Sequence, residues 1–441
     1  MKANQKIVLS ALVAGMVTLT GCGGGGGGSA ALPVNSDPQP ISGACTTVGS
    51  VTATGTTIGG KEEVVLQGCL DSTLGSALTL DASKIYAING EVSVKGATLT
   101  IPAGTTLYGR TGQSYLAIDQ GAKIEATGTQ ANPIVFTSAA DVAGTAGAND
   151  QGKWGGVSIF GTAHSNKGVE TYEAGDHQFA CDDNTVACNN ADNSGTLEYV
   201  VIKYSGFEVE TDKELNGLSL GGVGSGTTID HVAVIGSLDD GIEVWGGTVN
   251  MTNLYLYNNA DDSLDWDHGW TGSATNLYIE QNLVDSDGSR GFETDNNGGS
   301  VLKEQATPIS NPTIDQFTIV TSALGGQGIV HREGTAGQLS NGIIITNNAA
   351  RANVEVRSTT TLTQGLAYSG DMVLSQAADI HYAGKADNGT DVFGTTTAAQ
   401  VQAIVEGATV TLDNTGETLA NLKAATPTAG ADVTSMPAWT N

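Results

Sequence analysis

The sequence of 441 residues predicts an all-β fold, a right-handed, single-stranded parallel β-helix. Three observations predict it: a repeat of short segments, apolar residues that alternate with period two inside each segment, and 61 glycines against only 9 prolines. A short repeat cannot enclose a core alone, but successive coils stacked about 4.8 Å apart bury one continuous apolar ladder. Leucine-rich repeats are disfavoured because their leucine and asparagine consensus is missing, and β-propellers because they need longer blades.

The repeat is clearest between Asn193 and Arg357. There, Thr228–Gly247 and Asn250–Gly269 superpose at an offset of 22 residues without a gap. Alternation places two apolar columns on the inner face of one strand: Val200, Val232, Leu254, Leu277, Phe317 and Ile343, and then Ile202, Val234, Leu256, Ile279, Ile319 and Ile345. A second strand follows about ten residues later, with the inward column Leu218, Ile242, Leu264, Phe292 and Ile329. The turn between the strands holds residue types that tolerate left-handed backbone conformations, namely Gly236, Asn258 and Asn347.

The other elements are arranged around this repeat. We expect the β-helix over residues 45–357, with residues 45 to about 90 as an N-terminal cap followed by less regular coils. Glu170–Asn193 and Asp285–Ser310 break the coil rhythm and are predicted to be insertions. Residues 358–441 are predicted to form C-terminal coils and a cap, with a short helix at Thr396–Glu406.

The first residues predict export and a lipid anchor. Residues 1–21 have a basic start and an apolar stretch too short to span a bilayer, which is typical of a removable signal segment. Leu19 to Cys22 resembles the lipobox of bacterial lipoproteins, so acylation is expected at Cys22, and an ordinary cleaved signal with a chance cysteine is the alternative. Residues 22–44 are predicted to be a flexible Gly/Pro-rich tether. Gly23 is not the aspartate that favours inner-membrane retention, so we expect an outer-membrane anchor that faces the cell exterior or, alternatively, the periplasm.

Four cysteines remain behind the lipobox, and an even number in an exported chain indicates disulfides. Proximity favours Cys45 with Cys69 and Cys181 with Cys188 among the three connectivities that four cysteines allow. Metal binding by these cysteines is disfavoured because there is no CxxC spacing.

The charge balance limits the partners. The chain has 18 basic and 46 acidic residues, and loss of two signal lysines leaves a net charge of about −30. Nucleic-acid binding is disfavoured because a polyphosphate backbone would be repelled. An acidic polysaccharide such as pectate or alginate is expected to approach only when divalent cations bridge the charges.

Four segments together resemble a family of bacterial exported right-handed β-helix proteins, many of them labelled multidrug transporters: Gly152–Gly161, Asp192–Val200, Asn216–Thr227 and Leu238–Glu243. The resemblance spans roughly residues 90–350, and its ordered set of motifs is specific. It implies a β-helix of the kind also found in pectate lyases and polygalacturonases, and a cell-surface setting. It implies no particular reaction.

Aligned repeats place acidic residues on adjacent coils: Asp239 beside Asp261, Asp240 beside Asp262, and Glu243 beside Asp265. Carboxylates at coil spacing repel one another, so either a cation bridges them or some stay protonated. Calcium accepts six to eight oxygen ligands in flexible geometry and is the predicted cofactor, with solvated acidic turns as the alternative. The predicted metal-ligating set also contains Asp267, Asp285, Asp287, Glu293 and Asp295.

A catalytic interpretation uses the same residues. The doublets Asp239-Asp240 and Asp261-Asp262 are similar to the aspartate pairs of β-helix polygalacturonases, in which one acid protonates the leaving oxygen and other carboxylates activate water. A lyase would instead need calcium and an arginine base, for which Arg290 and Arg332 are the candidates. Both analogies are incomplete, because the Gly-His-Gly histidine and the Arg-Ile-Lys substrate clamp are missing.

Aromatic residues flank the acidic segments. Tyr255 and Tyr257 alternate with the core column and, with Trp270, are predicted to stack on sugars, whereas Trp266 is predicted to lie in the core. These observations favour a non-enzymatic cell-surface lipoprotein that binds extracellular glycan or another surface partner through a calcium-braced acidic face. The alternatives are a polysaccharide lyase or glycoside hydrolase acting on polyuronates, and a purely structural cell-envelope protein.

Overall fold

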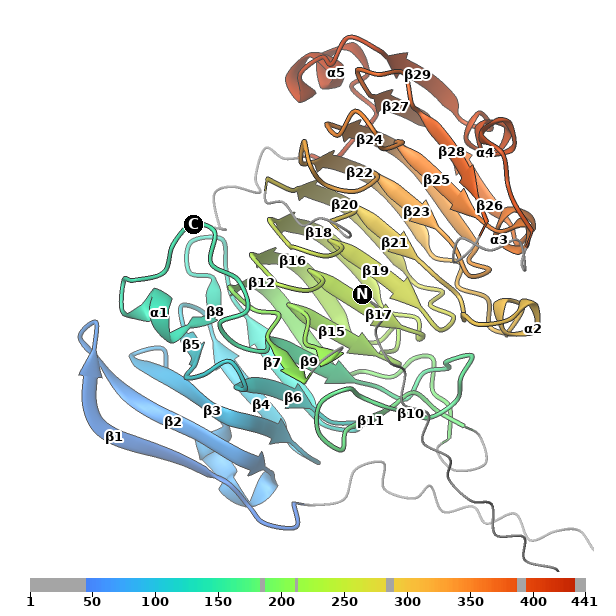
Figure 1. The fold of residues 1–441 in the computed structure, drawn as a ribbon. Helices are drawn as coiled ribbons and strands as arrows, with labels where there is room; N and C mark the ends of the chain where they lie inside the picture. Colours follow the sequence, from blue (N-terminus) through green and yellow to red (C-terminus); the bar gives the residue numbers. More distant parts are fainter. Residues whose placement is uncertain (1–44, 183–186, 211–212, 283–288, 387–393, 433–441) are drawn as a thin grey trace, which may run out of the picture. The chain divides into compact units, whose positions relative to one another are not determined.

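The computed structural model describes residues 45–182, 187–210, 213–282, 289–386 and 394–432. The predicted signal segment, Cys22, the tether, Asp285 and Asp287 lie outside the described residues. The described chain forms the right-handed parallel β-helix that the repeat predicts, with short strands stacked coil upon coil (Figure 1). None of the helices in this part of the chain is long and apolar enough to cross a membrane.

The strands form three parallel sheets. Sheet 1 consists of β4 (Thr98–Pro102), β7 (Lys123–Thr127), the first halves of β12 (Gly195–Lys203), β16 (Thr228–Ile235), β18 (Asn250–Tyr257), β20 (Ser273–Glu280), β22 (Thr313–Thr321) and β24 (Gly337–Thr346), and β26 (Leu366–Ser369). Sheet 2 runs from β5 (Thr106–Gly109) and β8 (Ile134–Ser138) through the second halves of the same long strands to β27 (Asp371–Ser375) and β29 (Thr409–Asp413). Sheet 3 contains β6 (Tyr115–Ile118), β9 (Val157–Phe160), β15 (Leu218–Gly221), β17 (Ile242–Trp245), β19 (Leu264–Asp267), β21 (Phe292–Thr294), β23 (Ile329–His331), β25 (Val354–Arg357) and β28 (Tyr382–Lys385).

Both ends of the solenoid carry extra elements. At the N-terminal end, β1 (Ser50–Ile58) pairs antiparallel with β2 (Lys61–Leu70), and η1 (Ser72–Leu78) and β3 (Lys84–Val94) follow. At the C-terminal end lie α3 (Thr359–Thr363), α4 (Ala398–Val405) and α5 (Leu419–Ala425). The predicted helix at 396–406 is confirmed as α4, which starts with a capping box between Thr397 and Gln400. The two predicted insertions hold the hairpin of β10 (Glu170–Thr171) with β11 (Gln178–Phe179) and the helix α2 (Val301–Glu304). Two further insertions were not predicted, and they hold α1 (Ala139–Val142) and the hairpin of β13 (Glu208–Glu210) with β14 (Lys213–Glu214).

The long strands bend because each contains one residue in the left-handed region. These corner residues have φ between 48° and 60° and occupy the same register on successive coils: Tyr199, His231, Asn253, Asn276, Gln316 and Asn341. Asparagine tolerates this conformation, and its amide links neighbouring coils, as Asn276 Nδ2 does when it donates to Asn253 Oδ1 at 2.7 Å. The bend separates sheet 1 from sheet 2, so each middle coil has three strands, the upper limit of the two or three that a short repeat suggests.

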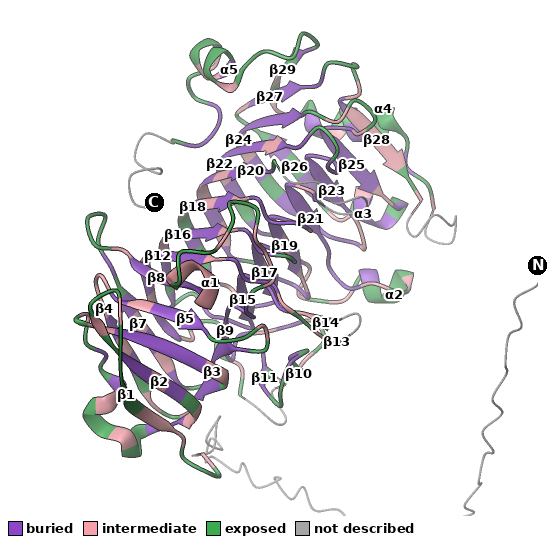
Figure 2. Ribbon diagram, turned by 60° about the vertical axis from the view of Figure 1, so that its left-hand side comes forward, coloured by how far each residue is buried: buried purple, intermediate pink, exposed green. Residues whose placement is uncertain are grey.

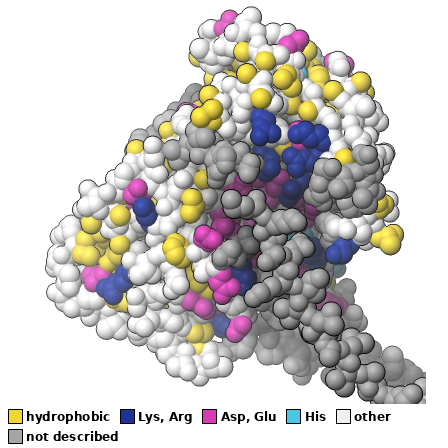
Figure 3. Space-filling view, in the orientation of Figure 1, with side chains coloured by type: hydrophobic (Ala, Val, Ile, Leu, Met, Phe, Trp, Pro, Cys, Tyr) yellow, Lys and Arg dark blue, Asp and Glu magenta, His cyan; other side chains and the backbone are white. Residues whose placement is uncertain are grey.

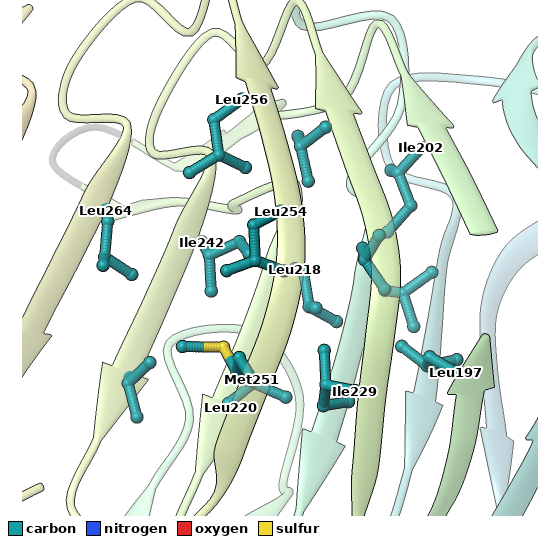
Figure 4. Close-up of a cluster of buried hydrophobic side chains, with 14 of the residues drawn as sticks. Leu197, Ile202, Leu218, Leu220, Ile229, Ile242, Met251, Leu254, Leu256 and Leu264 are labelled. Carbon is teal, nitrogen blue, oxygen red and sulfur yellow. The ribbon is translucent and has the colours of Figure 1, made fainter. Parts of the chain in front are cut away.

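Up to the coil of β22, the predicted apolar columns point into the solenoid and are buried (Figures 2 and 4). A third inward column, which precedes the corner, is not apparent from the two-column alignment: Leu197, Ile229, Met251, Ala274, Ile314 and Leu339. The prediction was wrong on the last coil, where Gly342 pairs with Phe317 and Ile344 with Ile319. A Cβ at Gly342 would stand 2.3 Å from the Phe317 ring, so only glycine fits this inward position. Ile343 and Ile345 therefore point outward, where they pack against Leu422 of α5.

Two further predictions concern turns and disulfides. Gly236 and Asn258 have the expected positive φ, at 73° and 54°. Asn347 does not adopt it; its side-chain amide instead donates to the Thr321 carbonyl at 2.8 Å. Both predicted disulfides are present, Cys45–Cys69 in the cap and Cys181–Cys188 in the insertion.

Candidate functional site

Acidic residues cluster on the outer side of sheet 3 and in the turns that lead into it. Glu243, Asp265 and Glu293 are opposite one another on β17, β19 and β21, which confirms the predicted alignment of the first two. The doublets precede β17 and β19. We call the following set the carboxylate face: Asp239, Asp240, Glu243, Asp261, Asp262, Asp265, Glu293 and Asp295.

The second aspartate of each doublet has a structural role. Asn216 Oδ1 accepts from the backbone N–H of Asp240 at 3.2 Å, Asp240 Oδ1 accepts from that of Asp262 at 2.9 Å, and Asp262 Oδ1 accepts from that of Arg290 at 2.8 Å. Each side chain therefore satisfies a buried donor on the next coil, where an unpaired N–H would be costly. The fixed backbone holds these carboxylates in line, with Asp240 5% and Asp262 1% exposed.

The carboxylate oxygens come close enough to share a cation. One group joins Asp239, Asp240 and Asp261, and another joins Asp240, Glu243 and Asp265; within each group one oxygen per residue lies within 4.8 Å of the others. Asp240 belongs to both groups. Oxygen atoms in this arrangement could contact a single hard cation such as Ca²⁺, which prefers carboxylate ligands.

Electrostatics in these groups disfavours ionised carboxyls. Burial and the charge of Asp261 hold the pKa of Asp239 well above its ordinary value, and burial and Asp239 do the same for Asp240. Burial and the neighbouring acids likewise raise the pKa values of Glu243 and Asp265. Among the described residues, no lysine or arginine forms an ion pair with Asp239, Asp240, Glu243 or Asp265. Asp265 Oδ1 is buried and accepts no hydrogen bond from the described chain.

Two arginines contact the other end of the carboxylate face. Arg290 Nη1 lies 2.9 Å from Asp262 Oδ2 and 2.8 Å from Glu293 Oε1. Arg332 Nη2 lies 3.0 Å from Glu293 Oε2 and 2.7 Å from Asp295 Oδ2. Burial lowers the pKa of both guanidiniums, but their carboxylate partners outweigh it and hold the pKa above the ordinary value. A guanidinium in this state is a poor proton acceptor.

Basic residues continue along sheet 3 beyond the arginine pairs. Arg357 and Lys385 both contact Glu355, each at 2.8 Å. Lys385 keeps 49% of its side chain exposed. In Figure 3 the basic side chains border the acidic ones on this side of the molecule. The outer side of sheet 3 thus changes sign along the coil stack.

Asp267 forms ion pairs beside the carboxylate face. Its Oδ2 lies 2.6 Å from His268 Nε2 and 3.9 Å from Lys167 Nζ, and His268 Nδ1 lies 3.0 Å from Glu170 Oε2. Burial lowers the pKa of His268, but Asp267 and Glu170 outweigh it and raise the pKa to about 9. Asp267 therefore anchors an insertion to β19, although it was predicted with the metal-ligating set.

Two acidic residues near the carboxylate face were not predicted. Glu173 and Glu214 come from the hairpin insertions, and both raise the pKa of Asp239. Burial and Glu214 raise the pKa of Glu173 itself. Neither residue lies in the repeat, so the alignment of coils gave no signal for them.

The predicted aromatic strip is divided between different parts of the fold. Tyr255 and Tyr257 lie on the second half of β18, in sheet 2, and the Tyr255 ring stacks on Tyr278 at 5.7 Å. The prediction was wrong for Trp270, which is fully buried and donates its indole N–H to the Val249 carbonyl at 3.0 Å. Trp266 is fully buried, as predicted. A sugar on the carboxylate face therefore cannot stack on Trp270.

Comparison with known proteins gives one result. No curated protein and no solved structure was found to match the chain. A family model described as a pectate-lyase-like beta helix domain matches residues 72–441. This range includes every described coil from η1 onward, together with the carboxylate face. The chain therefore belongs to the pectate-lyase-like β-helix domain family.

Proposed function

We propose that the protein is a cell-surface lipoprotein that binds extracellular glycan, or another surface partner, through a calcium-braced carboxylate face. One observation carries the proposal: two groups of three carboxylates share Asp240, and within each group the oxygens lie within 4.8 Å of one another. Burial and mutual repulsion raise the pKa values of the residues concerned. A bound divalent cation would relieve that repulsion at neutral pH.

The donor set fits calcium. Asp239, Asp240 and Asp261 would form one side of the site, and Glu243 and Asp265 the other. All five offer hard oxygen ligands, and calcium completes its shell with water or ligand oxygens. Bound calcium would supply positive charge at which hydroxyl or carboxylate oxygens of a glycan can coordinate. The strongly acidic chain needs such a bridge to approach a polyuronate.

Binding explains the geometry better than the two catalytic alternatives do. Arg290 and Arg332, the predicted lyase bases, are each held by two carboxylates that keep them protonated. Asp240 and Asp262 are occupied as acceptors for backbone N–H groups. Glycosidases separate their two carboxyls by about 6.5–9.5 Å when they invert and by about 5–5.5 Å when they retain configuration, whereas the oxygens within these groups lie within 4.8 Å of one another. Membership in a family named for pectate lyases is the observation that favours an enzyme.

Calcium titration tests the binding proposal. The melting temperature of the native chain should rise with calcium and fall with chelator, by an amount equivalent to about 2.7 kcal/mol when free calcium is a hundred times Kd. Asp265→Asn should abolish most of this shift, because it removes a ligand that caps no backbone group. Glu198→Gln, on the first half of β12 in sheet 1, is the matched control and should behave like the native chain.

Glycan binding is measured in the same samples. Affinity electrophoresis on pectate and alginate should retard the native chain only with calcium present. An unchanged melting temperature in calcium would contradict the metal proposal, and no retardation on any glycan would contradict the binding proposal. Release of reducing ends or unsaturated products, abolished when Asp240 and Asp262 are replaced, would instead establish the enzyme alternative. A purely structural envelope protein would show none of these effects.

The lipid anchor rests on the sequence of the signal segment. Leu19 to Cys22 matches a lipobox, and the glycine-rich stretch after Cys22 would hold the β-helix away from the membrane. Metabolic labelling with a palmitate analogue in a bacterial host should mark the native chain and not Cys22→Ala. Label on both proteins, or on neither, would contradict acylation at Cys22. Protease accessibility on intact cells then tells whether the β-helix faces the exterior or the periplasm.

A further inference from the structure

We propose that the carboxylate face receives the end of a polysaccharide chain, because an insertion covers sheet 3 on the N-terminal side of the face. We call this insertion, residues 170–181, the wall. The inference rests on the proposed glycan binding and adds the mode of recognition. A ligand that follows the coil stack along sheet 3 would reach this wall next to Glu243 and could not continue past it. Only the terminal sugar of a chain can occupy such a position.

The wall lies over a continuous outward row of sheet 3. The row runs through successive coils as Ala117, Ser158, Ser219, Glu243, Asp265 and Glu293. Its first three members are 0%, 1% and 0% exposed although they point out of the solenoid. The side of the row that leads into the carboxylate face is therefore covered by other parts of the chain.

Tyr172 is the centre of this cover. Its hydroxyl lies 3.0 Å from Ser158 Oγ and 3.0 Å from Ser219 Oγ, directly over the outward row. The ring packs against Phe160 and against Trp245, with centroids 4.9 Å and 5.7 Å away. Trp245 is on β17, the same strand as Glu243. The cover thus ends at the coil where the carboxylates begin.

The insertion that carries Tyr172 is fixed to the solenoid. A Cβ at Gly221 would stand 2.6 Å from the Phe179 ring, and one at Gly222 would stand 2.5 Å from the Ala180 backbone. Two glycines on the coil therefore permit this close approach. Gln120, in the turn after β6, donates to the Ala180 carbonyl of the insertion at 2.7 Å, and the Cys181–Cys188 disulfide follows Ala180.

An ion pair adds a second attachment. His177 of the insertion is 2% exposed, and its Nδ1 lies 2.8 Å from Asp119 Oδ1, next to β6. The imidazole also stacks on Phe160 with centroids 5.4 Å apart. These contacts hold the insertion as a rigid boundary of the face.

The wall offers hydrogen-bond acceptors to a chain end. Glu173 follows Tyr172 directly, is exposed, and lines a hollow together with Glu210 of the neighbouring hairpin. Its charge and that of Glu214 also act on Asp239 of the carboxylate face. A terminal sugar differs from an internal one by a free hydroxyl in place of a glycosidic oxygen. Carboxylates accept hydrogen bonds from hydroxyl groups and cannot bond an ether oxygen, so this wall distinguishes an end from the interior of a chain.

Binding stoichiometry on a size ladder tests the inference. Polygalacturonate would be fractionated from short oligomers to long chains, and each fraction titrated with the full native chain in calcium. Chain-end recognition predicts at most two proteins bound per polymer molecule, one for each end, at every length, and equal affinity when concentration is expressed per chain end. A number of bound proteins that grows with chain length would overturn the inference while leaving glycan binding intact. Absence of binding to every fraction would instead contradict the proposed function.

A variant of the wall gives an independent measurement. Glu173→Gln should lower the affinity for the short oligomers by about tenfold, because one charged acceptor is lost. Its melting temperature should still rise with calcium, because Glu173 belongs to neither metal group. Glu198→Gln is the control with no expected change. Equal affinities for Glu173→Gln and the native chain would remove the wall from recognition.

Discussion

Asp240 shows how one side chain combines a structural and a chemical role. Its Oδ1 accepts the Asp262 backbone N–H, while the carboxylate belongs to both candidate metal groups. On the preceding coil only the structural role is present, because Asn216 accepts the backbone N–H of Asp240 with an uncharged amide. Asparagine at position 240 is therefore compatible with the coil geometry, and charge can be removed there without loss of the backbone contact.

A pair of substitutions at this residue separates the two roles. Asp240→Ala leaves the Asp262 N–H buried without an acceptor, so in chelator its free energy of unfolding should be about 1–3 kcal/mol below that of Asp240→Asn. Asp240→Asn keeps an acceptor and removes a carboxyl whose pKa burial and Asp239 raise. In chelator, it should be at least as stable as the native chain, and calcium should no longer stabilise it. Urea unfolding measures both; equal destabilisation by Ala and Asn would contradict the backbone role.

At the scale of the elements, some parts of the fold could be predicted from the sequence and others could not. The apolar columns of the second strand, from Leu218 to Ile329, pair as predicted because period-two burial leaves a direct pattern. The corner between sheets 1 and 2 was hidden because its residues share a backbone conformation and not a residue type, with tyrosine, histidine, asparagine and glutamine all in the left-handed region. The shift at Gly342 depends on the volume of the Phe317 ring on the neighbouring coil, a contact that alignment by apolarity cannot represent.

The same distinction between predictable and unpredictable features applies to the candidate site. Coil-to-coil stacking of Glu243 on Asp265 follows from the repeat offset, and so it could be predicted. Glu173 and Glu214, which raise the pKa of Asp239, come from insertions that fold back on sheet 3. The residues of an insertion do not align with those of the repeat, so their positions could not be predicted from it. The burial of Trp270 was missed for a different reason: Trp270 lies in the turn between β19 and β20, where there is no period-two alternation, and its indole donates to the Val249 carbonyl. Sequence repeats predict contacts between coils, whereas contacts made by insertions need the folded structure.

At the scale of the whole molecule, the chain has a formal net charge of −28, and calcium and protons compete for the same carboxyl groups. Six carboxyls have folded-state pKa values well above the ordinary value, each first because of burial: Asp239, Asp240, Glu243, Asp262, Asp265 and Asp295. The folded chain therefore binds more protons than the unfolded chain above pH about 4, so without metal the free energy of unfolding decreases as pH rises toward neutral. His331 acts in the opposite direction, because burial lowers its pKa to about 3 and protons favour the unfolded state below pH about 6.5.

Calcium should weaken this pH dependence. Bound metal keeps Asp239, Asp240, Glu243 and Asp265 ionised in the folded state, which removes their part of the dependence. The histidines nearly offset one another, because burial lowers the pKa of His331 whereas acidic neighbours raise the pKa values of His177 and His268 to about 9. We therefore expect the melting temperature to rise as the pH falls from about 7 to about 5 in chelator, and to rise much less over the same interval in saturating calcium. Differential scanning calorimetry in both conditions measures it, and Asp265→Asn should follow the chelator curve even in calcium. Parallel curves with and without calcium would show that the carboxylates and the metal are not linked, and would contradict the calcium site.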